Sequence, residues 1–225
     1  MKERALVCTD DDVRGILTGK KTQFRRAVRN LPEGAELGTL ADWNSHKADS
    51  RMQDADERFL ERHVIFRRPV AASEVDGRGI APSGVFGRRM YPYEPGGHLW
   101  VQEVHAVNVP GCQGGTSYRA DHPDPRGDGP ANPMTWRPAP TMGRSRARIF
   151  LDIEAVRVER LCDISIDDVF AEGIRPYDGC KSNQDAESWD PIDYFREQWA
   201  NGPWKRAPWS QNPFVWVVDF KRSRP

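Results

Sequence analysis

The apolar segments of this chain are short and lie far apart, and this spacing limits the folds that it can adopt. Strand patterns are found in residues 5–8, 22–28, 98–104, 149–158 and 213–221. The helical patterns are shorter, and their N-caps are Thr9, Ser165 and Asp190. Because strands and helices do not alternate regularly, a doubly wound α/β sheet is not expected. The sequence predicts an α+β protein built on a small mixed β-barrel with short flanking helices.

Two long polar regions interrupt this pattern. Residues at about 30–90 and 108–145 are rich in Gly, Pro and polar side chains. Within the first region, residues 54–62 have a helical pattern and residues 64–66 have a strand pattern. Loops of this length in a compact domain are usually functional or disordered. We therefore expect a single domain over residues 1–225 that carries two long loop insertions.

The alternation of residues 149–158 contains an irregularity. Apolar and polar side chains alternate as far as Ala155, and beyond it the apolar positions shift to Val156 and Val158. Such a shift is typical of an extra residue in one strand of an antiparallel pair. The pattern predicts a bulge or bend at this point of the strand.

The segment Gly19–Arg26 places four cations and a hydroxyl group within eight residues, directly after a short helix. Such a density of donors suits an anionic ligand such as a nucleotide or an RNA backbone. If the segment continues as a strand, Arg25 and Arg26 point to opposite faces, and only one of them lines a cleft. Lys21 either holds a phosphate or carbonyl oxygen, or is a solvated lysine that complements the helix C-terminus.

A second group of candidates lies on the predicted strand 98–104. Glu103 and His105 share one face of this strand with two apolar residues. A carboxylate on such a face is partly buried and needs a partner. We expect Glu103 to pair with Lys21, either as a general acid or base or as a structural ion pair. His105 either adds a group that titrates near neutrality or is simply hydrogen-bonded.

Aromatic and basic residues provide further candidates for ligand contacts. Trp100 and Tyr118 can stack on a base, although core packing also explains most aromatic residues of this kind. Arg144, Arg146 and Arg148 stand at alternate positions before a strong strand. In an extended segment they would face one way, as a second patch for phosphate or as a solvated edge.

Composition and motif searches exclude several classes of protein. The formal net charge is zero, so no overall field attracts nucleic acid. The four cysteines form no C-x-x-C pair and the five histidines show no metal-ligand spacing, so we expect no metal and no cofactor. Neither G-x-x-x-x-G-K-[ST] nor a G-x-G-x-x-G after a strand is found, which argues against an NTPase and a dinucleotide cofactor. The widely spaced thiols, with no signal peptide and no membrane-length apolar run, predict a cytoplasmic protein.

Four segments also follow a known family pattern: residues 16–26, 95–103, 147–174 and 212–220. The first matches Gly-x-Lys-x-x-(polar)-x-Arg at Gly19, Lys21 and Arg26, with Phe24 at the polar position. In this order the four segments resemble the ASCH superfamily, whose fold is the PUA-like β-barrel. They are similar to its longer, phage- and prophage-associated branch.

The resemblance implies a cleft against the barrel that faces nucleotides or RNA. Some small members of the superfamily are amidohydrolases that remove an acyl group from N4-acylated cytidine, using a Lys, a Thr nucleophile and a Glu. Others have been viewed as RNA-binding or RNA-cleaving modules. Phe24 can neither attack a carbonyl group nor move a proton, which argues against that covalent route. Thr22 is the nearest hydroxyl, but it lies ~6–7 Å away along the strand.

Three functions remain open. The preferred one is recognition of RNA or a modified nucleoside in a basic cleft formed by Lys21, Arg26, Glu103 and a nearby aromatic residue. The alternative is an amidohydrolase in which Lys21 and Glu103 assist attack by Thr22 or by water, and the third is a phage-associated structural or interaction protein. Position 24 discriminates between the first two: Phe24 in the cleft favours binding, whereas Thr22 beside Lys21 favours catalysis. The oligomeric state does not follow from the sequence.

Overall fold

The computed structural model of this chain describes residues 3–29, 31, 35–39, 63–67, 85–90, 93–107, 115–122, 134–176, 188–202 and 206–223. The chain divides into two compact units. One consists of Met1–Ala27 together with Pro95–Pro225, and the other consists of Val28–Glu94. The second unit covers the region in which the sequence predicts the first insertion.

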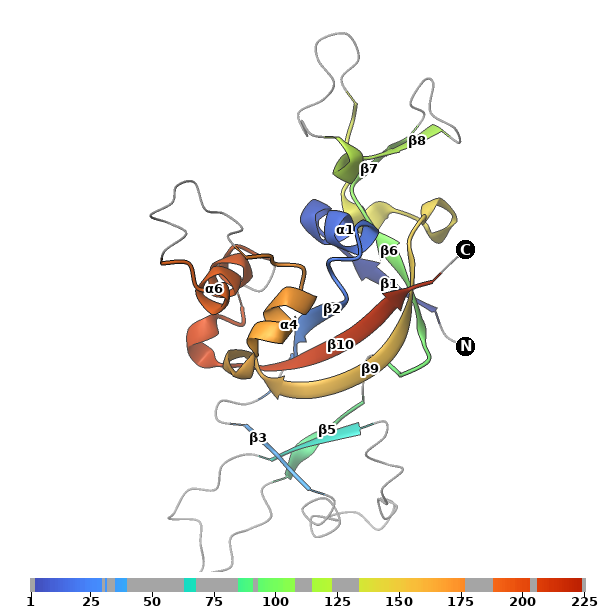
Figure 1. Ribbon diagram of the computed structural model, residues 1–225. Coiled ribbons are helices and arrows are strands. Elements are labelled where there is room, and N and C mark those ends of the chain that lie inside the picture. The colour runs from blue at the N-terminus through green and yellow to red at the C-terminus, as the bar shows by residue number, and fades with distance from the viewer. Residues whose placement is uncertain are drawn as a thin grey trace, which may run out of the picture. The chain divides into compact units, whose positions relative to one another are not determined.

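A five-stranded sheet forms the centre of the first unit (Figure 1). In spatial order its strands are β1 (Glu3–Val7), β6 (His98–Gln102), β9 (Phe150–Arg160), β10 (Phe214–Arg222) and β2 (Gln23–Ala27). β1 and β6 run parallel, and the other neighbouring pairs are antiparallel. The structure is therefore α+β, with a mainly sheet core and few helices. Within the described residues the sheet is open, with β1 and β2 as its edges, so the closed barrel predicted from the sequence is not formed.

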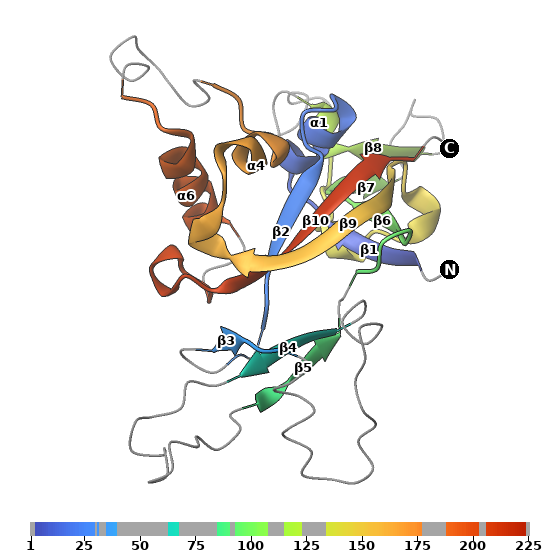
Figure 2. The same cartoon turned by 60° about the horizontal axis from the view of Figure 1, so that its bottom comes forward.

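The two longest strands of this sheet, β9 and β10, are strongly curved (Figure 2). Asp219 of β10 lies opposite Ala155, whereas the next residue, Phe220, lies opposite Ile153. Glu154 is therefore the extra residue of a bulge in β9, which confirms the irregularity predicted near Ala155. A bulge of this kind bends its strand and increases the local twist.

In the part of the chain that the structure describes, three α-helices accompany the sheet, and each begins at a side-chain cap. Thr9, Ser165 and Asp190 each accept a hydrogen bond from a backbone N–H in the first turn of their helix. These helices are α1 (Asp10–Leu17), α4 (Ile166–Ala171) and α6 (Pro191–Asn201). Since short polar side chains of this type satisfy the free N–H groups of a helix end, the predicted starting points are confirmed.

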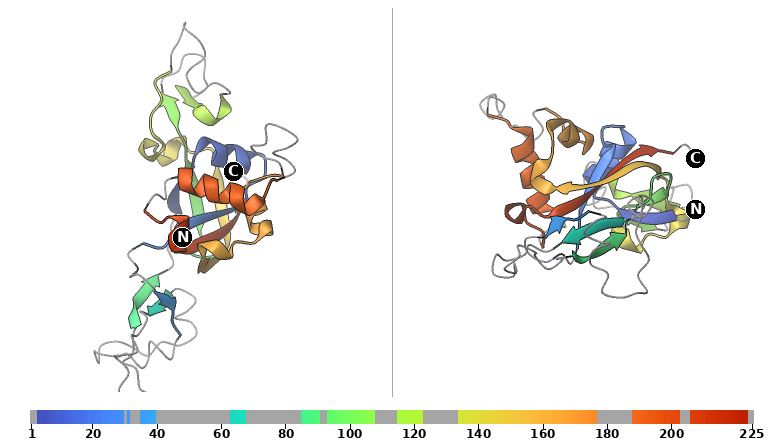
Figure 3. Two further views of the ribbon diagram at one scale, coloured as in Figure 1. Left: turned by 90° about the vertical axis from the view of Figure 1, so that its left-hand side faces the viewer. Right: turned by 90° about the horizontal axis from the view of Figure 1, so that it is seen from below.

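The helices α4 and α6 lie beside each other at the β2 side of the sheet (Figures 1 and 3). Between them and the sheet is a core of buried apolar side chains. Its members are Ala27, Leu161, Ile164, Val169, Ile174, Phe195, Trp199, Val215 and Val217. Burial of such a cluster is the main source of stability for short helices, which are marginal on their own.

The second unit contains a three-stranded antiparallel sheet. Its strands, in spatial order, are β3 (Glu36–Leu37), β4 (His63–Arg67) and β5 (Val85–Met90). Val64, Ile65 and Phe66 of β4 are buried, in agreement with the strand pattern of residues 64–66. The helix predicted over residues 54–62 lies outside the described residues.

The region of the second predicted insertion is partly regular in its described residues. β7 (His105–Val107) pairs with β8 (Thr116–Tyr118), and short 3-10 turns follow at Arg119–Asp121, Ala139–Thr141 and Arg144–Arg146. The prediction of one long loop is therefore wrong for these segments. Paired backbone groups and turn hydrogen bonds replace the structureless loop that the Gly and Pro content indicated.

The predicted strand over residues 98–104 is also corrected. It ends at Gln102, and β7 begins at His105 after a break in the ladder. Glu103 therefore lies between two strands and does not continue the alternating face of β6. Among the described residues, no helix combines the length and the apolar character that crossing a membrane requires.

Candidate ligand-binding pocket

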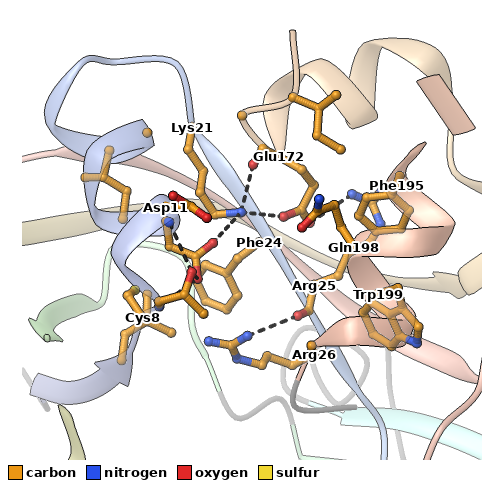
Figure 4. Close-up of a pocket in the computed structure, with 18 of the residues that line it drawn as sticks. Cys8, Asp11, Lys21, Phe24, Arg25, Arg26, Glu172, Phe195, Gln198 and Trp199 are labelled. Atoms are coloured by element: carbon orange, nitrogen blue, oxygen red, sulfur yellow. Dashed lines mark hydrogen bonds and ion pairs between the residues drawn. The ribbon is translucent and has the colours of Figure 1, made fainter. Parts of the chain in front are cut away.

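A pocket of about 680 Å³ lies at the edges of the five-stranded sheet (Figure 4). Its walls come from the end of β1, from α1, from β2, from the turn after α4 and from α6. The volume lies within the range of roughly 300–1,000 Å³ that is typical of small-molecule sites. The two edge strands of the open sheet, β1 and β2, thus both border this pocket.

Lys21 lies in this pocket with its ammonium group fully engaged. The Nζ atom is 2.6 Å from Glu172 Oε2, 2.9 Å from the Glu172 carbonyl oxygen and 3.2 Å from Asp12 Oδ1. An ammonium group has three N–H donors, so each has an acceptor. Burial alone would lower the pKa of Lys21, but the charges of Glu172 and Asp12 outweigh it and raise that pKa. Lys21 is therefore a cation near neutral pH and does not act as a base.

Two glycines hold the aliphatic part of the Lys21 side chain. A Cβ atom at Gly15 would lie 3.0 Å from the Lys21 Cβ, and one at Gly173 would lie 3.1 Å from the same atom. Gly173 also has a φ of +101°, which a residue with a side chain rarely adopts. The close packing on both sides fixes Lys21 and explains a glycine in the middle of α1.

Glu172 connects the pocket to a buried ion network on the sheet. Its Oε1 atom accepts a hydrogen bond of 3.2 Å from Arg25 Nη1, while its Oε2 atom faces Lys21. The Nη2 atom of Arg25 lies 2.7 Å from Glu159 and 3.2 Å from Asp168. Arg25 also donates to the side chain of Gln23. Both terminal nitrogens of the Arg25 guanidinium group thus contact protein acceptors, whereas its buried Nε atom has no hydrogen-bond partner among the described residues; the residue also lines the pocket.

Arg26 joins the two edges of the sheet. Its Nη2 atom donates a hydrogen bond of 2.8 Å to the carbonyl oxygen of Val7, the last residue of β1. Its guanidinium carbon lies 5.3 Å from the centre of the Phe24 ring. Because both arginines line the pocket, the expectation that only one of them faces a cleft is wrong.

Aromatic side chains form much of the apolar wall. Phe24 lines the pocket, and its ring centre lies 5.9 Å from that of Phe220. Figure 4 shows Phe195 and Trp199 of α6 on the opposite side of the pocket from α1. Planar apolar side chains of this kind can stack on a flat ring, although each of these four is at most 5% exposed.

The charges around the pocket balance. The acidic side chains that line it are Asp11, Asp12 and Glu172, and the basic ones are Lys21, Arg25 and Arg26. The cleft expected from the sequence was basic, whereas the observed pocket has no excess of positive side chains. The two acidic residues that contact Lys21 cause this difference, because the dense cations of the Gly19–Arg26 segment are neutralised by partners elsewhere in the chain.

The pocket offers little support for a side-chain nucleophile. Thr22 is exposed and does not line it, and the Thr22 N–H instead donates to the Ala171 carbonyl oxygen over 2.8 Å. The hydroxyl of Thr9 donates to Asp12 within the cap of α1. Burial raises the pKa of the Cys8 thiol to about 12, so this thiol stays protonated near neutral pH.

Glu103 does not pair with Lys21, so that prediction is wrong. The carboxylate of Glu103 is fully buried and accepts two hydrogen bonds from Arg148, of 2.9 Å and 2.8 Å. Arg148 also contacts Asp121 at 2.6 Å, and its guanidinium carbon lies 4.0 Å from the ring centre of Tyr118. Burial raises the pKa of Glu103, against the effect of Arg148. These residues form a separate ion cluster that lines neither the main pocket nor the smaller hollow beside Thr22.

The ring residues predicted near the site also lie outside the pocket. His105 is buried with its Nδ1 atom 3.2 Å from the Glu103 carbonyl oxygen, and burial lowers its pKa. The hydroxyl of Tyr118 donates to the carbonyl oxygen of Arg146 over 2.7 Å. Trp100 is half-buried on β6, in register with residues 5 and 150.

The predicted arginine patch is not formed. Arg144 and Arg146 lie in a 3-10 turn rather than in an extended segment, so alternate residues do not share a face. Arg144 forms an ion pair with Glu3, and Arg146 is exposed. Neither lines the pocket.

The residues that sequence reasoning missed are the acidic partners of Lys21 and the aromatic wall of α6. Asp12 had an evident role as a capping residue, and Glu172 stood one position before a helix-ending glycine. Glu172 lies 151 positions after Lys21, so nothing local in either segment indicates the contact. Phe195 and Trp199 have the spacing of a buried helix face, which is what they also provide.

Comparison with protein-family models, with curated proteins and with solved structures finds no match to this chain. Among the described residues, no group of three or more His, Cys, Asp or Glu side chains is placed to hold a metal ion. The site must therefore be interpreted from its own geometry.

Proposed function

We propose that this protein recognises a nucleobase-bearing ligand, either RNA or a modified nucleoside, in the pocket at the sheet edges. The observation that carries the proposal is the position of Phe24. Its ring lines the pocket beside Arg26, whereas Thr22, the nearest hydroxyl on the same segment, does not line it. This arrangement favours stacking over covalent catalysis.

The pocket has both features that base recognition requires. Phe24, Phe195 and Trp199 supply apolar planar surfaces, and the group around Lys21 supplies fixed polar atoms. A few convergent polar groups in a largely preformed apolar pocket are typical of small-molecule sites. A purely structural role for the protein gains no support from an open pocket with convergent charges.

The same proposal includes a PUA-like fold of the ASCH type. Its support is the curved five-stranded sheet, whose edge strands β1 and β2 approach each other and are joined by the Arg26–Val7 hydrogen bond. Lys21 and Arg26, the cationic residues of the family pattern, both line the pocket.

Binding measurements test the proposal. Isothermal titration calorimetry with cytidine, N4-acetylcytidine, adenosine, uridine and a short single-stranded RNA should detect at least one ligand. Truncating a stacking side chain costs about 1–3 kcal/mol per base, so Phe24→Leu should weaken binding by roughly 5–150-fold. Phe150→Leu is the matched control, because Phe150 does not line the pocket. Absence of binding by every ligand, or equal effects of the two variants, contradicts the proposal.

An amidohydrolase is the second candidate, and the contact between Lys21 and Glu172 favours it. A carboxylate held 2.6 Å from a buried ammonium group inside a pocket can orient water and accept its proton. In this version Glu172 takes the role expected of Glu103, and water replaces the threonine nucleophile. Release of acetate from N4-acetylcytidine that disappears in Glu172→Gln, but not in Glu103→Gln, would establish it. Binding without turnover in the wild-type protein excludes it for this substrate.

A further inference from the structure

The cations of the pocket already make several contacts with protein acceptors, although the buried Nε of Arg25 has no hydrogen-bond partner in the described part of the chain. All three donors of Lys21 face oxygens, and four side chains accept from or pair with Arg25. Arg26 donates to the Val7 carbonyl and lies against the Phe24 ring. A phosphate group binds strongly where charged donors are available to it in pairs. Here it would have to displace contacts that the protein already makes.

The carboxylates of the pocket oppose an anion directly. Asp12 and Glu172 both contact Lys21, and Asp11 stands on the same wall with its side chain 92% exposed. Three acidic and three basic side chains line the pocket, so a ligand phosphate would leave it with an excess of negative charge. Burying a charge without a free partner costs several kcal/mol.

The same carboxylates are suitable partners for N–H donors. Each side-chain oxygen of Glu172 accepts one hydrogen bond from a cation, Lys21 or Arg25, and a carboxylate oxygen can accept two hydrogen bonds. An exocyclic amino group of a base donates to carboxylates, as cytosine does in nucleic-acid recognition. The aromatic walls accept the ring of such a base.

From these observations, and on the basis of the function proposed above, we infer that the pocket selects an unphosphorylated nucleoside whose base carries an exocyclic amino group. The base lies between the aromatic walls and donates its amino group to the acidic residues that contact Lys21. A 5′-phosphate is disfavoured because these acidic residues repel it and because Lys21, the cation that they contact, already directs its three donors at protein oxygens. The ligand is thus a free nucleoside rather than an RNA chain.

Calorimetry with cytidine, uridine and their 5′-monophosphates tests this selection. Cytidine should bind at least about tenfold more tightly than either uridine or cytidine 5′-monophosphate, which corresponds to about 1.4 kcal/mol in each comparison. Because no counterions are released, its affinity should change little between low and physiological salt. The full-length chain is used throughout.

The variant Asp12→Asn removes one negative charge from the pocket at constant shape. It should reduce the preference for cytidine over its monophosphate by several-fold. Asp167→Asn is the matched control, because Asp167 is an exposed residue in the first turn of α4 that does not line the pocket. The melting temperature of each variant separates a folding defect from a change in selection.

The outcomes are distinguishable. Equal or tighter binding of the monophosphate, with affinity that falls as salt rises, overturns this inference and identifies a nucleotide or RNA as the ligand, while the proposed function stands. Equal binding of uridine overturns the role of the amino group. Absence of binding by all nucleosides, nucleotides and single-stranded RNA overturns the proposed function as well.

Discussion

Glu172 is the carboxylate of the pocket that contacts both Lys21 and Arg25. It receives Lys21 on one oxygen and Arg25 on the other, and its backbone carbonyl oxygen also contacts Lys21. It thereby links the pocket to a buried network that connects the sheet with α4. A change at Arg25 should therefore mainly affect stability, whereas a change at Lys21 should mainly affect ligand binding.

Arg25 is expected to contribute to the stability of the fold. Its side chain is almost fully buried, and its removal takes one cation away from each of Glu159, Asp168 and Glu172. Only the more exposed Arg157 then remains for Glu159 and Asp168, and only Lys21 remains for Glu172. Breaking a buried ion pair by removing one partner typically costs about 3–5 kcal/mol, so we expect Arg25→Met to lower the free energy of unfolding by about that amount. Urea denaturation measures it. The exposed Arg146 supplies the control, and Arg146→Met should change stability by less than about 0.5 kcal/mol.

Asp168 should make stability depend on acid pH. Burial would raise its pKa, but hydrogen bonds from Gln23 and Arg157 and the charge of Arg25 lower it to about 2. The usual pKa in an unfolded chain is about 3.9. A lowered folded-state pKa stabilises the folded form while the group is ionised, so this contribution is present above about pH 4 and is lost as the pH falls toward 2.

The variant Asp168→Asn isolates this contribution. The difference in unfolding free energy between the wild-type protein and the variant should be constant above about pH 5 and should shrink between pH 4 and 2. Urea titrations at several pH values measure it, with the exposed Asp163→Asn as the reference. A difference that does not change with pH would contradict the assignment of the Asp168 pKa.

At the scale of elements, α1 and its glycine position the cation of the site. Gly15 lies inside a helix, where alanine is favoured by up to about 1 kcal/mol. The Lys21 side chain occupies the space that a Cβ atom would need, at 3.0 Å. We expect Gly15→Ala to leave the stability within about 1 kcal/mol of the wild type, while ligand affinity falls about tenfold or more because Lys21 is displaced.

The control for this variant is Gly143→Ala. A Cβ atom there would meet only the Ser145 hydroxyl, at 4.0 Å, and Gly143 does not line the pocket. Calorimetry with the ligand found for the wild-type protein and thermal unfolding provide the two readouts. Unchanged affinity in Gly15→Ala would show that the contact with Lys21 is not what keeps a glycine at this position.

The sequence patterns predicted the secondary-structure elements better than they predicted the contacts between residues. The strands β1, β9 and β10 and the three helix caps were predicted because apolar alternation and capping are local properties. The strand predicted over residues 98–104 was too long, because its apolar pattern continued past the point at which pairing ends. Residues 141–148 were misread as extended because short 3-10 turns have no strong sequence pattern.

The site was predicted only in part for the same reason. The density of cations marked Lys21 and Arg26, but their partners come from α1, from the end of α4 and from the last residue of β1. Which carboxylate contacts a given lysine depends on the spatial order of the strands in the sheet. The sequence of a single segment does not determine that order. Glu103 was a reasonable candidate whose charge is instead satisfied by Arg148.

At the scale of the whole molecule, the two compact units predict that unfolding can be assigned to one unit at a time. Every tryptophan except Trp43 belongs to the unit formed by residues 1–27 and 95–225, so tryptophan fluorescence mainly reports on that unit. Leu161 is fully buried in that unit, and Leu161→Ala should lower the free energy of unfolding of the unit by about 2–5 kcal/mol.

The matched change in the other unit is Ile65→Ala. Ile65 is 1% exposed, so its truncation should destabilise its own unit by about 2–5 kcal/mol, whereas the fluorescence transition of the first unit should change by less than about 0.5 kcal/mol. Urea unfolding followed by tryptophan fluorescence compares the two variants. Equal effects would show that the units unfold as one cooperative body.

The open edges of the sheet have a consequence beyond ligand binding. An edge strand presents unpaired backbone groups to which a strand of another molecule can add. In this chain, β1 carries Glu3 and Arg4 on its exposed edge, while its last residue, Val7, is occupied by the hydrogen bond from Arg26. The same arginine that lines the pocket therefore also occupies one backbone acceptor at the end of β1, which leaves that edge one hydrogen bond fewer to offer to a strand of another molecule.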